Sequence, residues 1–413
     1  MRIAIVGAGI SGLGAAYLLA RGHDVELFER AGSAGGHTNT VSHWVGGRRL
    51  GLDTGFLVHN ERNYPNLLRL FRELGVRTQD AEMSFSVTCG RCALEYSGRR
   101  PFAQRRNLAR PRFASLLYEI GRWLRTALRS LEERDYERHT LGRYLAERGY
   151  SPRFRDHFLI PLTSALWSTA PERALDFPAA YAIRFFDHHG MLGFGRFGWR
   201  TVSGGSRAYV RALEQRLGGR LHTGLGVRAV RRTPGGVELT TEDGVTRAFD
   251  KVVIATHADQ ALALLADPAD EERRTLGAFR YTTNETVLHT DESLLPRCAK
   301  ARASWNFQRP DCSSATGKPT ITYYLNRLQA LEEDRHYSVT LNRTAAIDPA
   351  RVIARFDYHH PLYTLESLAA QRKLGELSGR RNTYYAGAHH GNGFHEDGLV
   401  SGVRAAAALG VAW

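Results

Sequence analysis

Three glycines and one acidic residue near the start of the sequence have the spacing of a dinucleotide site. Gly7, Gly9 and Gly12 follow the apolar run 2–6, which is typical of a buried parallel strand, and precede a helical segment rich in alanine and leucine. Gly7 permits a tight turn, Gly9 lets the backbone approach a pyrophosphate, and Gly12 lets the helix pack on the strand. The helix N-terminus offers N–H groups to phosphates. Glu29, which lies 20 residues after Gly9, can accept hydrogen bonds from ribose hydroxyls.

Histidines and cysteines are the other residue types that could act in catalysis or bind a metal. His390 and His395 are candidates for proton transfer, because imidazole titrates near neutral pH; the alternative is hydrogen bonding within a glycine-rich turn. No histidine pair stands at the helical i, i+4 spacing with a third ligand. Cys89 and Cys92 could form half of a redox or zinc site, but no second pair at zinc spacing follows, and a hairpin turn is the simpler interpretation. We therefore predict no metal site.

A second glycine pair, Gly35-Gly36, follows Glu29-Arg30 within a few residues and leads into His37-Thr38. This pattern resembles the extended fingerprint of the flavin-dependent amine oxidase, protoporphyrinogen oxidase and phytoene desaturase superfamily. The resemblance implies non-covalently bound FAD and an α/β fold. In that fold a Rossmann-like FAD-binding domain of the glutathione-reductase type carries an inserted substrate domain of mixed sheet plus helices. Relatives usually place an arginine after the glycine pair. Here His37 and Thr38 replace it, which leaves phosphate binding to backbone donors.

The resemblance continues in segments far apart along the chain. It implies that Asp53, Gly55 and Phe56 run beneath the flavin, that a Val227 backbone group contacts adenine, and that Ala255-Thr256 ends a strand beside the cofactor. Near the C-terminus, Ala388 replaces the acid that many relatives carry after the glycine at 387. Asp397 could take over from that acid or serve as an N-cap. The full predicted cofactor-binding set is Gly7, Gly9, Ile10, Ser11, Gly12, Glu29, Arg30, Gly35, Gly36, His37, Thr38, Asp53, Gly55, Phe56, Val227, Ala255, Thr256, Gly387, Ala388, Asp397, Gly398 and Leu399, the last two through N–H groups near a ring carbonyl.

The remaining elements divide the chain into two discontinuous domains. An amphipathic helix is expected at 113–135, further helices at 141–148 and 178–186, and a strand-rich sheet at 281–358. We assign 1–58, 200–275 and 376–413 to the FAD-binding domain, and 59–199 and 276–375 to the substrate-binding domain. Several strings, GAHHGNGFHEDGL among them, resemble a bacterial branch described as predicted NAD/FAD-binding or amine-oxidase-like proteins. Members of that branch often occur beside cyclopropane-fatty-acid-synthase-like methyltransferases, which implies a functional link to a fatty-acid methyltransferase.

The resemblance also implies the kind of reaction. In the superfamily the flavin takes a hydride at N5. Amine oxidases of the group carry a lysine after the Ala-Thr strand, but the matching stretch 279–290 has none. Trp305 and Tyr358, or Tyr384 and Tyr385, could form an aromatic cage or simply pack. With His390 and His395, Trp305 and Tyr358 are our catalytic candidates. We expect a desaturase-like oxidoreductase acting on a small hydrophobic substrate such as a lipid acyl chain. The alternatives are an amine oxidase that produces hydrogen peroxide, a non-redox isomerase or mutase, and a binding protein.

Charge and composition bear on location and partners. The net charge is +14, and only four of the 56 basic residues are lysines, so coding bias towards arginine competes with binding to anionic lipid or an acidic substrate. The arginine-rich stretch 99–112 ahead of Trp123 predicts a peripheral membrane contact or a solvated surface. No base-stacking pattern or nucleic-acid motif is present, so we expect no nucleic-acid partner. Few cysteines, no leading signal sequence and no long apolar run predict a cytoplasmic protein, at most peripheral to a membrane.

Overall fold

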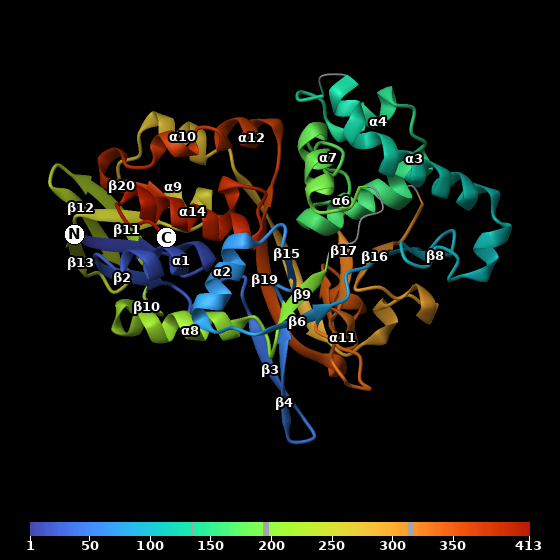
Figure 1. The fold of residues 1–413 in the computed structure, drawn as a ribbon, viewed down its shortest axis with the longest axis horizontal. Coiled ribbons are helices and arrows are strands. Elements are labelled where there is room, and N and C mark those ends of the chain that lie inside the picture. The colour runs from blue at the N-terminus through green and yellow to red at the C-terminus, as the bar shows by residue number, and fades with distance from the viewer. Residues whose placement is uncertain (134–135, 193–197, 313–316) are drawn as a thin grey trace.

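The computed structural model describes residues 1–133, 136–192, 198–312 and 317–413. A five-stranded parallel sheet has the order β10-β2-β1-β14-β20 (Figure 1). Its strands are β1 (Arg2–Val6), β2 (Asp24–Glu29), β10 (Leu221–Thr223), β14 (Lys251–Ile254) and β20 (Thr383–Tyr385). β14 pairs with β1, and β20 pairs with β14, although the three strands lie far apart in the sequence.

The central strand β1 buries both of its faces, because successive side chains point in opposite directions. Ile3 and Ile5 pack in a core with α1 (Ile10–Leu19), α2 (Pro65–Leu74), α8 (Arg207–Leu217) and α14 (His395–Ala408). Ala4 and Val6 pack in a second core on the other face. The elements of that core include β11 (Val227–Thr233), β12 (Gly236–Thr241), β13 (Thr246–Phe249), α9 (Ala258–Leu264), α10 (Asp270–Leu276), α12 (Leu365–Gln371) and α13 (Leu374–Leu377). A helix layer and a small meander therefore enclose the sheet.

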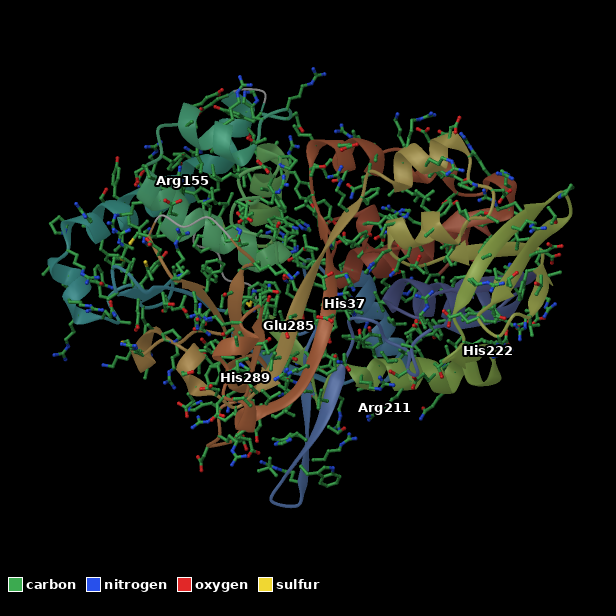
Figure 2. The ribbon with its side chains drawn as sticks, turned by 180° about the vertical axis from the view of Figure 1, so that it is seen from behind. His37, Arg155, Arg211, His222, Glu285 and His289 are labelled. Carbon is green, nitrogen blue, oxygen red and sulfur yellow. The ribbon has the colours of Figure 1, made fainter. Side chains whose placement is uncertain are left out.

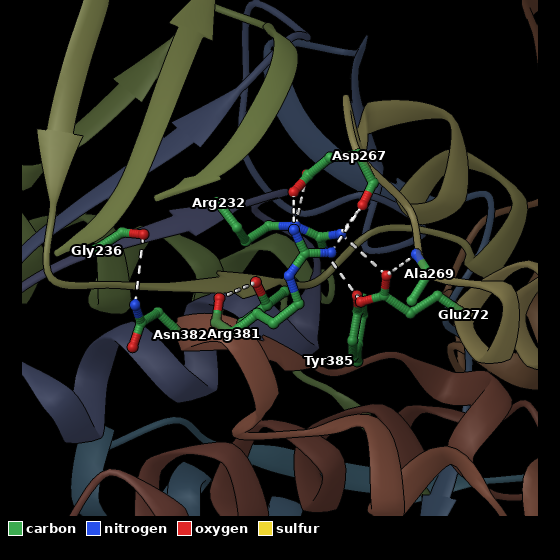
Figure 3. A network of polar contacts seen from close by, with 9 residues as sticks. Arg232, Gly236, Asp267, Ala269, Glu272, Arg381, Asn382 and Tyr385 are labelled. Atoms are coloured by element: carbon green, nitrogen blue, oxygen red, sulfur yellow. Dashed lines mark hydrogen bonds and ion pairs between the residues drawn. The ribbon is translucent and has the colours of Figure 1, made fainter. Parts of the chain in front are cut away.

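A network of polar contacts ties the second core to the edge strand β20 (Figure 3). Arg232 of β11 is buried, and its guanidinium donates to Asp267 and to both carboxylate oxygens of Glu272 at 3.0 Å. The hydroxyl of Tyr385 donates to Glu272 at 2.6 Å, and the Arg381 guanidinium contacts Asp267. The buried charges are thus paired, as burial away from water requires.

A seven-stranded sheet of order β19-β15-β18-β17-β16-β7-β8 lies beside the first. β15 (Arg280–His289) and β19 (Val352–Leu362) are its long edge pair, and they run between the two halves of the molecule (Figure 1). The other strands are β7 (Phe85–Cys89), β8 (Leu94–Ser97), β16 (Trp305–Arg309), β17 (Thr320–Tyr324) and β18 (Ser338–Leu341). Two small sheets pair β3 (Thr40–Val45) with β4 (Arg48–Asp53), and β9 (Trp199–Val202) with β5 (His59–Asn60) and β6 (Thr78–Ala81).

A helical block packs over the far strands of this sheet (Figure 1). It consists of α3 (Pro111–Glu133), α4 (Leu141–Glu147), α5 (Pro152–Phe154), a π-helical turn (Arg155–Leu159), α6 (Ile160–Trp167) and α7 (Ala179–His188). Trp123 of α3 is fully buried and meets Tyr144 edge to face at 5.9 Å. Trp123 therefore takes no part in a membrane contact, because the apolar face of α3 packs in the core.

The remaining short elements are α11 (Leu325–Leu328) and the 3-10 turns Arg105–Ala109, Gly218–Arg220, Glu292–Leu294, Ala299–Ala301, Thr344–Ala346, Pro349–Arg351, Arg380–Asn382 and Ala388–His390. The α/β fold is confirmed, and the helices predicted at 113–135, 141–148 and 178–186 correspond to α3, α4 and α7. The last two residues of the first, 134 and 135, lie outside the described residues. The domain limits stay a prediction. α2, just beyond the limit at residue 58, packs with the five-stranded sheet, whereas α3 to α7 pack with the seven-stranded one.

The last helix starts earlier than the sequence predicted. α14 begins at His395 with Phe394 as its N-cap, so Asp397 is the third residue of the helix and not its N-cap. From there its carboxylate accepts the Phe394 N–H at 2.9 Å. The Gly398 N–H already donates to the Phe394 carbonyl at 3.0 Å, as the i, i−4 ladder requires. The contact of the Gly398 and Leu399 N–H groups with a flavin carbonyl stays a prediction.

Candidate active site

A cavity of about 850 Å³ opens at the carboxyl end of β1 and extends to the helical block and the seven-stranded sheet. At one end it is lined by Glu29, Arg30, Val227 and Arg228, which we call the nucleotide end. At the other it is lined by Leu166, Trp167, Phe185, Trp305, Tyr323 and Leu341, which we call the substrate end. Predicted cofactor-binding residues that line it are Gly7, Gly9, Ile10, Ser11, Glu29, Arg30, Gly35, Gly36, His37, Gly55, Phe56, Val227, Ala255, Thr256, Gly387 and Ala388.

The glycine turn after β1 has the close approaches that its sequence predicted. Gly7 has a φ of +97°, a conformation that favours glycine. A Cβ on Gly12 would lie 1.9 Å from the Gly7 carbonyl oxygen, so α1 can pack here only because Gly12 lacks a side chain. A Cβ on Gly9, by contrast, would meet nothing within 4 Å. α1 also starts without a side-chain cap, so its first N–H groups are available to a phosphate at this wall.

The acidic residue after β2 braces the same turn. Glu29 accepts the Ala8 N–H at 2.8 Å and the Ala31 N–H at 2.9 Å, one on each carboxylate oxygen. Each oxygen keeps a further acceptor site for a ribose hydroxyl. Arg30 pairs with Glu242 at 2.8 Å at the rim. The nucleotide end therefore offers backbone donors for phosphates and a carboxylate for a ribose.

Asp53 and Thr38 lie behind the cavity wall, although the sequence placed both against the cofactor. The buried Asp53 carboxylate accepts hydrogen bonds from Thr40 at 2.5 Å and from the Ser206 backbone and hydroxyl at 2.8–3.0 Å. Burial raises the pKa of Asp53 to about 6, against the lowering effect of these donors. Thr38 contacts the hydroxyl of Tyr209. The side chains of Asp53 and Thr38 thus bond to other protein groups. They hold in place the segments whose adjacent residues, such as His37 and Gly55, line the cavity.

A group of histidines surrounds the middle of the cavity. The His37 ring stacks on Tyr358 with 4.9 Å between ring centroids, and its centroid lies 5.5 Å from that of His360. His37 lies beside the long strands β15 and β19 (Figure 2). Burial and neighbouring imidazoles lower the pKa of His37 to about 4 and of His360 to about 3. His257 stacks on Tyr281 at 4.3 Å, and burial lowers its pKa to about 4. These rings are therefore neutral at pH 7.

The two histidines predicted to transfer protons differ in placement. His395 lines the cavity, but its Nε2 is within 2.8 Å of the Thr38 hydroxyl and 2.9 Å of the Tyr209 hydroxyl, and its ring stacks on Phe56 at 4.0 Å. Burial lowers its pKa to about 3. His390 is not among the lining residues, because the 3-10 turn after Gly387 brings His389 to the cavity in its place. The roles of His390 and His395 in proton transfer stay predictions.

Two buried imidazole nitrogens support the presence of a ligand in the cavity. His37 Nε2 and His389 Nε2 are buried, and within the described part of the chain neither has a hydrogen-bond partner. Unpartnered buried polar atoms are uncommon in proteins. Together with the open space at Gly9 and the uncapped start of α1, they fit a long polar ligand that runs from the nucleotide end to the histidines.

The substrate end is lined by apolar and aromatic side chains that no motif indicated. Trp305 meets Tyr323 edge to face at 5.1 Å, and Leu166 and Trp167 of α6 line the same region. Of the predicted cage residues, Trp305 and Tyr358 line the cavity, whereas Tyr384 and Tyr385 pack elsewhere. All four lysines lie in the described part of the chain, and none of them lines the cavity.

The sequence from residue 10 to residue 410 matches the family described as flavin containing amine oxidoreductase. The chain belongs to this family. It is therefore an FAD-dependent oxidoreductase of the amine oxidase-like kind, and the residues of the nucleotide end fit the cofactor that the family uses. A search among curated sequences finds no match.

Solved structures share the fold over nearly the whole chain. A fatty acid isomerase from P. acnes, described as CLA-producing, is 18% identical with a TM-score of 0.71, covering 99% of each chain. A redesigned putrescine oxidase is 15% identical with a TM-score of 0.72, covering 99% of this chain and 98% of the other. A putative protoporphyrinogen oxidase from Exiguobacterium sp. 255-15 is 16% identical with a TM-score of 0.68, over the same shares. At these identities the likeness concerns the fold.

Proposed function

We propose that the enzyme uses FAD to oxidise the esterified acyl chain of a lipid in a desaturase-like reaction. The observation that carries the proposal is the chemistry of the substrate end, where aromatic and aliphatic side chains predominate, Ser168 and His189 are the polar exceptions, and the described lining contains no lysine. The residues of the nucleotide end would hold FAD, which would supply the hydride acceptor, and the second hydrogen of the acyl chain would leave as a proton to solvent. The side chains of the chain hold the substrate and exclude water.

The charged groups around the cavity argue against an ammonium substrate. Glu29 is the only carboxylate among the described lining residues, and it lies at the nucleotide end, where backbone N–H groups already donate to it. A protonated amine at the substrate end would lack a carboxylate partner, which is costly in a buried site. A free fatty acid would also lack a partner there, because Arg30 and Arg228 lie at the nucleotide end. An esterified acyl chain requires neither.

The neutral histidines determine what the middle of the cavity can do. Because His37, His257 and His360 have pKa values of about 4 or lower, they can donate or accept hydrogen bonds at pH 7 without carrying charge. They can therefore align a polar ring or an ester group without attracting a cation. The Tyr358 hydroxyl, which lies 2.6 Å from the Thr54 hydroxyl, holds the ring that stacks on His37.

Amine oxidation is the second candidate. The family description and the putrescine oxidase among the similar structures favour it, and Trp305 and Tyr358 place aromatic rings on the cavity wall. Isomerisation without net oxidation is a third possibility, for which the fatty acid isomerase is the precedent.

Anaerobic mixing of the FAD-loaded enzyme with candidate substrates tests the proposal. Phosphatidylcholine in mixed micelles should bleach the visible flavin absorbance, and mass spectrometry should find an acyl chain lighter by two hydrogens. A panel of mono- and diamines should leave the flavin oxidised. Bleaching by amines alone would overturn the proposal in favour of amine oxidation. A shifted double bond without net loss of hydrogen would overturn it in favour of isomerisation.

A charge placed on the cavity wall provides a matched variant test. Leu166→Glu puts a carboxylate at the substrate end and should lower kcat/KM for the lipid at least about tenfold while FAD stays bound. Leu128→Glu makes the same change on the exposed side of α3, where Leu128 is 40% exposed, and should leave kcat/KM unchanged. Equal activity of the two variants would contradict an apolar substrate site.

We further propose that residues 99–118 form a peripheral contact with anionic lipid. Phe102, Leu108 and Tyr118 are 46%, 69% and 67% exposed, and arginines surround them in the sequence. Apolar side chains among arginines suit the boundary between headgroups and acyl chains. None of the described helices is long and apolar enough to cross a membrane. Such a contact, together with a functional link to a fatty-acid methyltransferase, would place the enzyme beside lipid substrates.

Cosedimentation with vesicles tests the contact. The protein should bind vesicles containing phosphatidylglycerol and release them in high salt, whereas the Phe102→Ser, Leu108→Ser double variant should bind several-fold more weakly. Trp44→Ser, which removes an exposed aromatic from the β3–β4 hairpin, is the control and should bind normally. Loss of binding in the control, or none in the double variant, would contradict the assignment.

A further inference from the structure

Three cysteines and one histidine meet on the far side of the seven-stranded sheet from the five-stranded one. Cys89 ends β7, Cys92 lies in the turn before β8, and Cys312 follows β16. His157 comes from the π-helical turn between α5 and α6, next to Arg155, which is labelled in Figure 2. Three segments that are far apart in the sequence therefore meet at one place, with two potential ligand atoms from the Cys89–Cys92 turn and one each from His157 and Cys312. In proteins, π-helical turns often occur at functional sites.

The four ligand atoms have the spacing of a tetrahedral metal site. All lie within 4.8 Å of one another. Cys89 Sγ is 3.5 Å from Cys312 Sγ, and Cys92 Sγ is 3.8 Å from His157 Nε2. Zinc–sulfur bonds of about 2.3 Å at tetrahedral angles separate two sulfurs by about 3.8 Å. The two printed separations lie within about 0.3 Å of that value, and the upper limit of 4.8 Å requires the other ligand atoms to move inwards by about 1 Å at most.

We propose that Cys89, Cys92, Cys312 and His157 form a structural zinc site. The sequence predicted no metal site because no second cysteine pair follows at zinc spacing. In the folded chain His157 and Cys312 provide the two further ligands. A Cys-x-x-Cys turn combined with two further ligands is a common arrangement of closed structural sites with three cysteines and one histidine. No open position remains for a substrate, so the ion acts on stability and not on catalysis.

Positive side chains around the cluster suit the charge of the metal-bound form. Binding of Zn²⁺ replaces the three thiol protons, which pass to solvent, and leaves the four ligands and the ion with a net charge of −1. The Arg309 guanidinium donates to the Cys312 carbonyl at 3.1 Å, and Arg110 donates to the Cys92 carbonyl at 3.4 Å. Both arginines thus hold the ligand-bearing loops and bring positive charge beside the thiolates. The Tyr96 hydroxyl fixes the His157 carbonyl at 2.7 Å.

The ion would fasten the helical block to the sheet. The three cysteines belong to the end of the sheet that contains β7, β8 and β16. His157 lies three residues before the start of α6, and Leu166 and Trp167 of α6 line the substrate end. Loss of the metal should therefore loosen the wall of the cavity first. The nucleotide end, built on the five-stranded sheet, should keep its FAD.

Metal analysis of the purified holoenzyme is the first test. Protein expressed with added zinc and dialysed against a weak chelator should contain about one zinc per chain. Cobalt(II) exchanged into it should give the thiolate charge-transfer and d–d absorption of a tetrahedral site, outside the flavin bands after the flavin is reduced. Absence of both zinc and the cobalt spectrum would overturn the proposal. A Cys89–Cys312 disulfide in protein purified anaerobically would also overturn it.

Thiol titration tests the same site without any substitution. In the zinc-loaded protein a thiol reagent should modify Cys298 alone, because Cys298 lies outside the cluster and its Sγ donates to the Ala103 carbonyl at 3.4 Å. After a strong chelator removes the ion, three further thiols should react, and protease should cut within the helical block at least about tenfold faster. Equal reactivity before and after chelation would contradict the site.

Variants identify the ligands. Cys92→Ser and His157→Gln should each lose the bound zinc while keeping FAD, and Cys298→Ser, the matched control, should keep both. If a ligand variant does not fold, the thiol titration of the unmodified protein still decides the proposal. Zinc retained at full stoichiometry in both ligand variants would overturn it.

Discussion

At the scale of residues, neutral histidines line the middle of the cavity, and glycines line its wall at the turn after β1. His37, His257 and His360 are neutral because burial lowers each pKa well below 6.5. Gly9 and Gly12 differ in what their missing side chains allow. Gly12 gives room to the protein itself, whereas the space beyond Gly9 belongs to the cavity. This difference separates a substitution that damages binding from one that damages folding.

Gly9→Ala should weaken FAD binding at least about tenfold, or by about 1.4 kcal/mol, because its Cβ enters the space left for the pyrophosphate. The melting temperature of the apoprotein should fall by less than about 3 °C, since nothing in the fold contacts that Cβ. Fluorescence titration of the apoprotein with FAD and calorimetry measure the two effects.

Gly12→Ala is the matched comparison. Its Cβ would lie 1.9 Å from the Gly7 oxygen, so the apoprotein itself should be destabilised. If Gly9→Ala bound FAD normally, the assignment of this turn to the pyrophosphate would be refuted.

At the scale of elements, buried ion pairs and hydrogen bonds join β11, α10 and β20. Arg232 lies between Asp267 and Glu272 with its side chain 1% exposed. Burial opposes ionisation of Glu272, but hydrogen bonds from Arg232 and Tyr385 lower its pKa below the usual value. The pair is therefore charged when folded. Removing one partner leaves the other uncompensated.

Arg232→Leu should lower the free energy of unfolding by about 3–5 kcal/mol, because it leaves Glu272 charged and buried. The double variant Arg232→Leu, Glu272→Gln should recover at least half of that loss, since glutamine keeps an acceptor for Tyr385. Urea denaturation of the two variants measures both values.

Arg173→Leu is the control, because Arg173 and Asp176 pair on the surface with side chains 63% and 56% exposed. It should cost less than about 1 kcal/mol. Equal losses for Arg173→Leu and Arg232→Leu would show that burial does not determine the cost.

The sequence predicted those elements whose signals are local. Gly7, Gly9, Gly12 and Glu29 lie within 30 residues, and the contacts of Glu29 with Ala8 and of Gly12 with Gly7 are made within that one strand–helix–strand unit. It failed where contacts form only on folding: Trp167 and Phe185 reach the cavity from the helical block without any motif. The start of α14 was misplaced because Phe394 is an unusual N-cap, whereas Asp397 is a common one. The cysteines were dismissed as a metal site because His157 and Cys312 join them only in three dimensions.

At the scale of the whole molecule, burial of histidine makes stability depend on pH. Nine histidines have a lowered pKa, chiefly through burial: His37, His59, His189, His257, His289, His360, His389, His390 and His395. Between these lowered folded pKa values and the usual 6.5, the unfolded chain binds more protons than the folded one. Asp53 and Asp397, whose pKa values burial raises to about 6, act in the opposite direction. The histidines outnumber them.

The melting temperature should therefore be highest above pH 6.5 and fall as pH drops towards 4, by about 5 °C or more between pH 7 and pH 5. Scanning calorimetry of the apoprotein in buffers of equal ionic strength measures it. A melting temperature that stays constant or rises on acidification would contradict the neutral state assigned to these histidines.

The order of strands in the five-stranded sheet also governs when the enzyme can first hold its cofactor during synthesis. β1 is synthesised about 250 residues before its neighbour β14, and β20 and α14 follow both. α14 packs on α1 so closely that a Cβ on Gly402 would lie 2.3 Å from the Ser11 carbonyl oxygen. The nascent glycine turn therefore lacks its supporting helix until α14 (His395–Ala408) has been synthesised. Ribosome-bound chains that stop short of β20 should remain colourless.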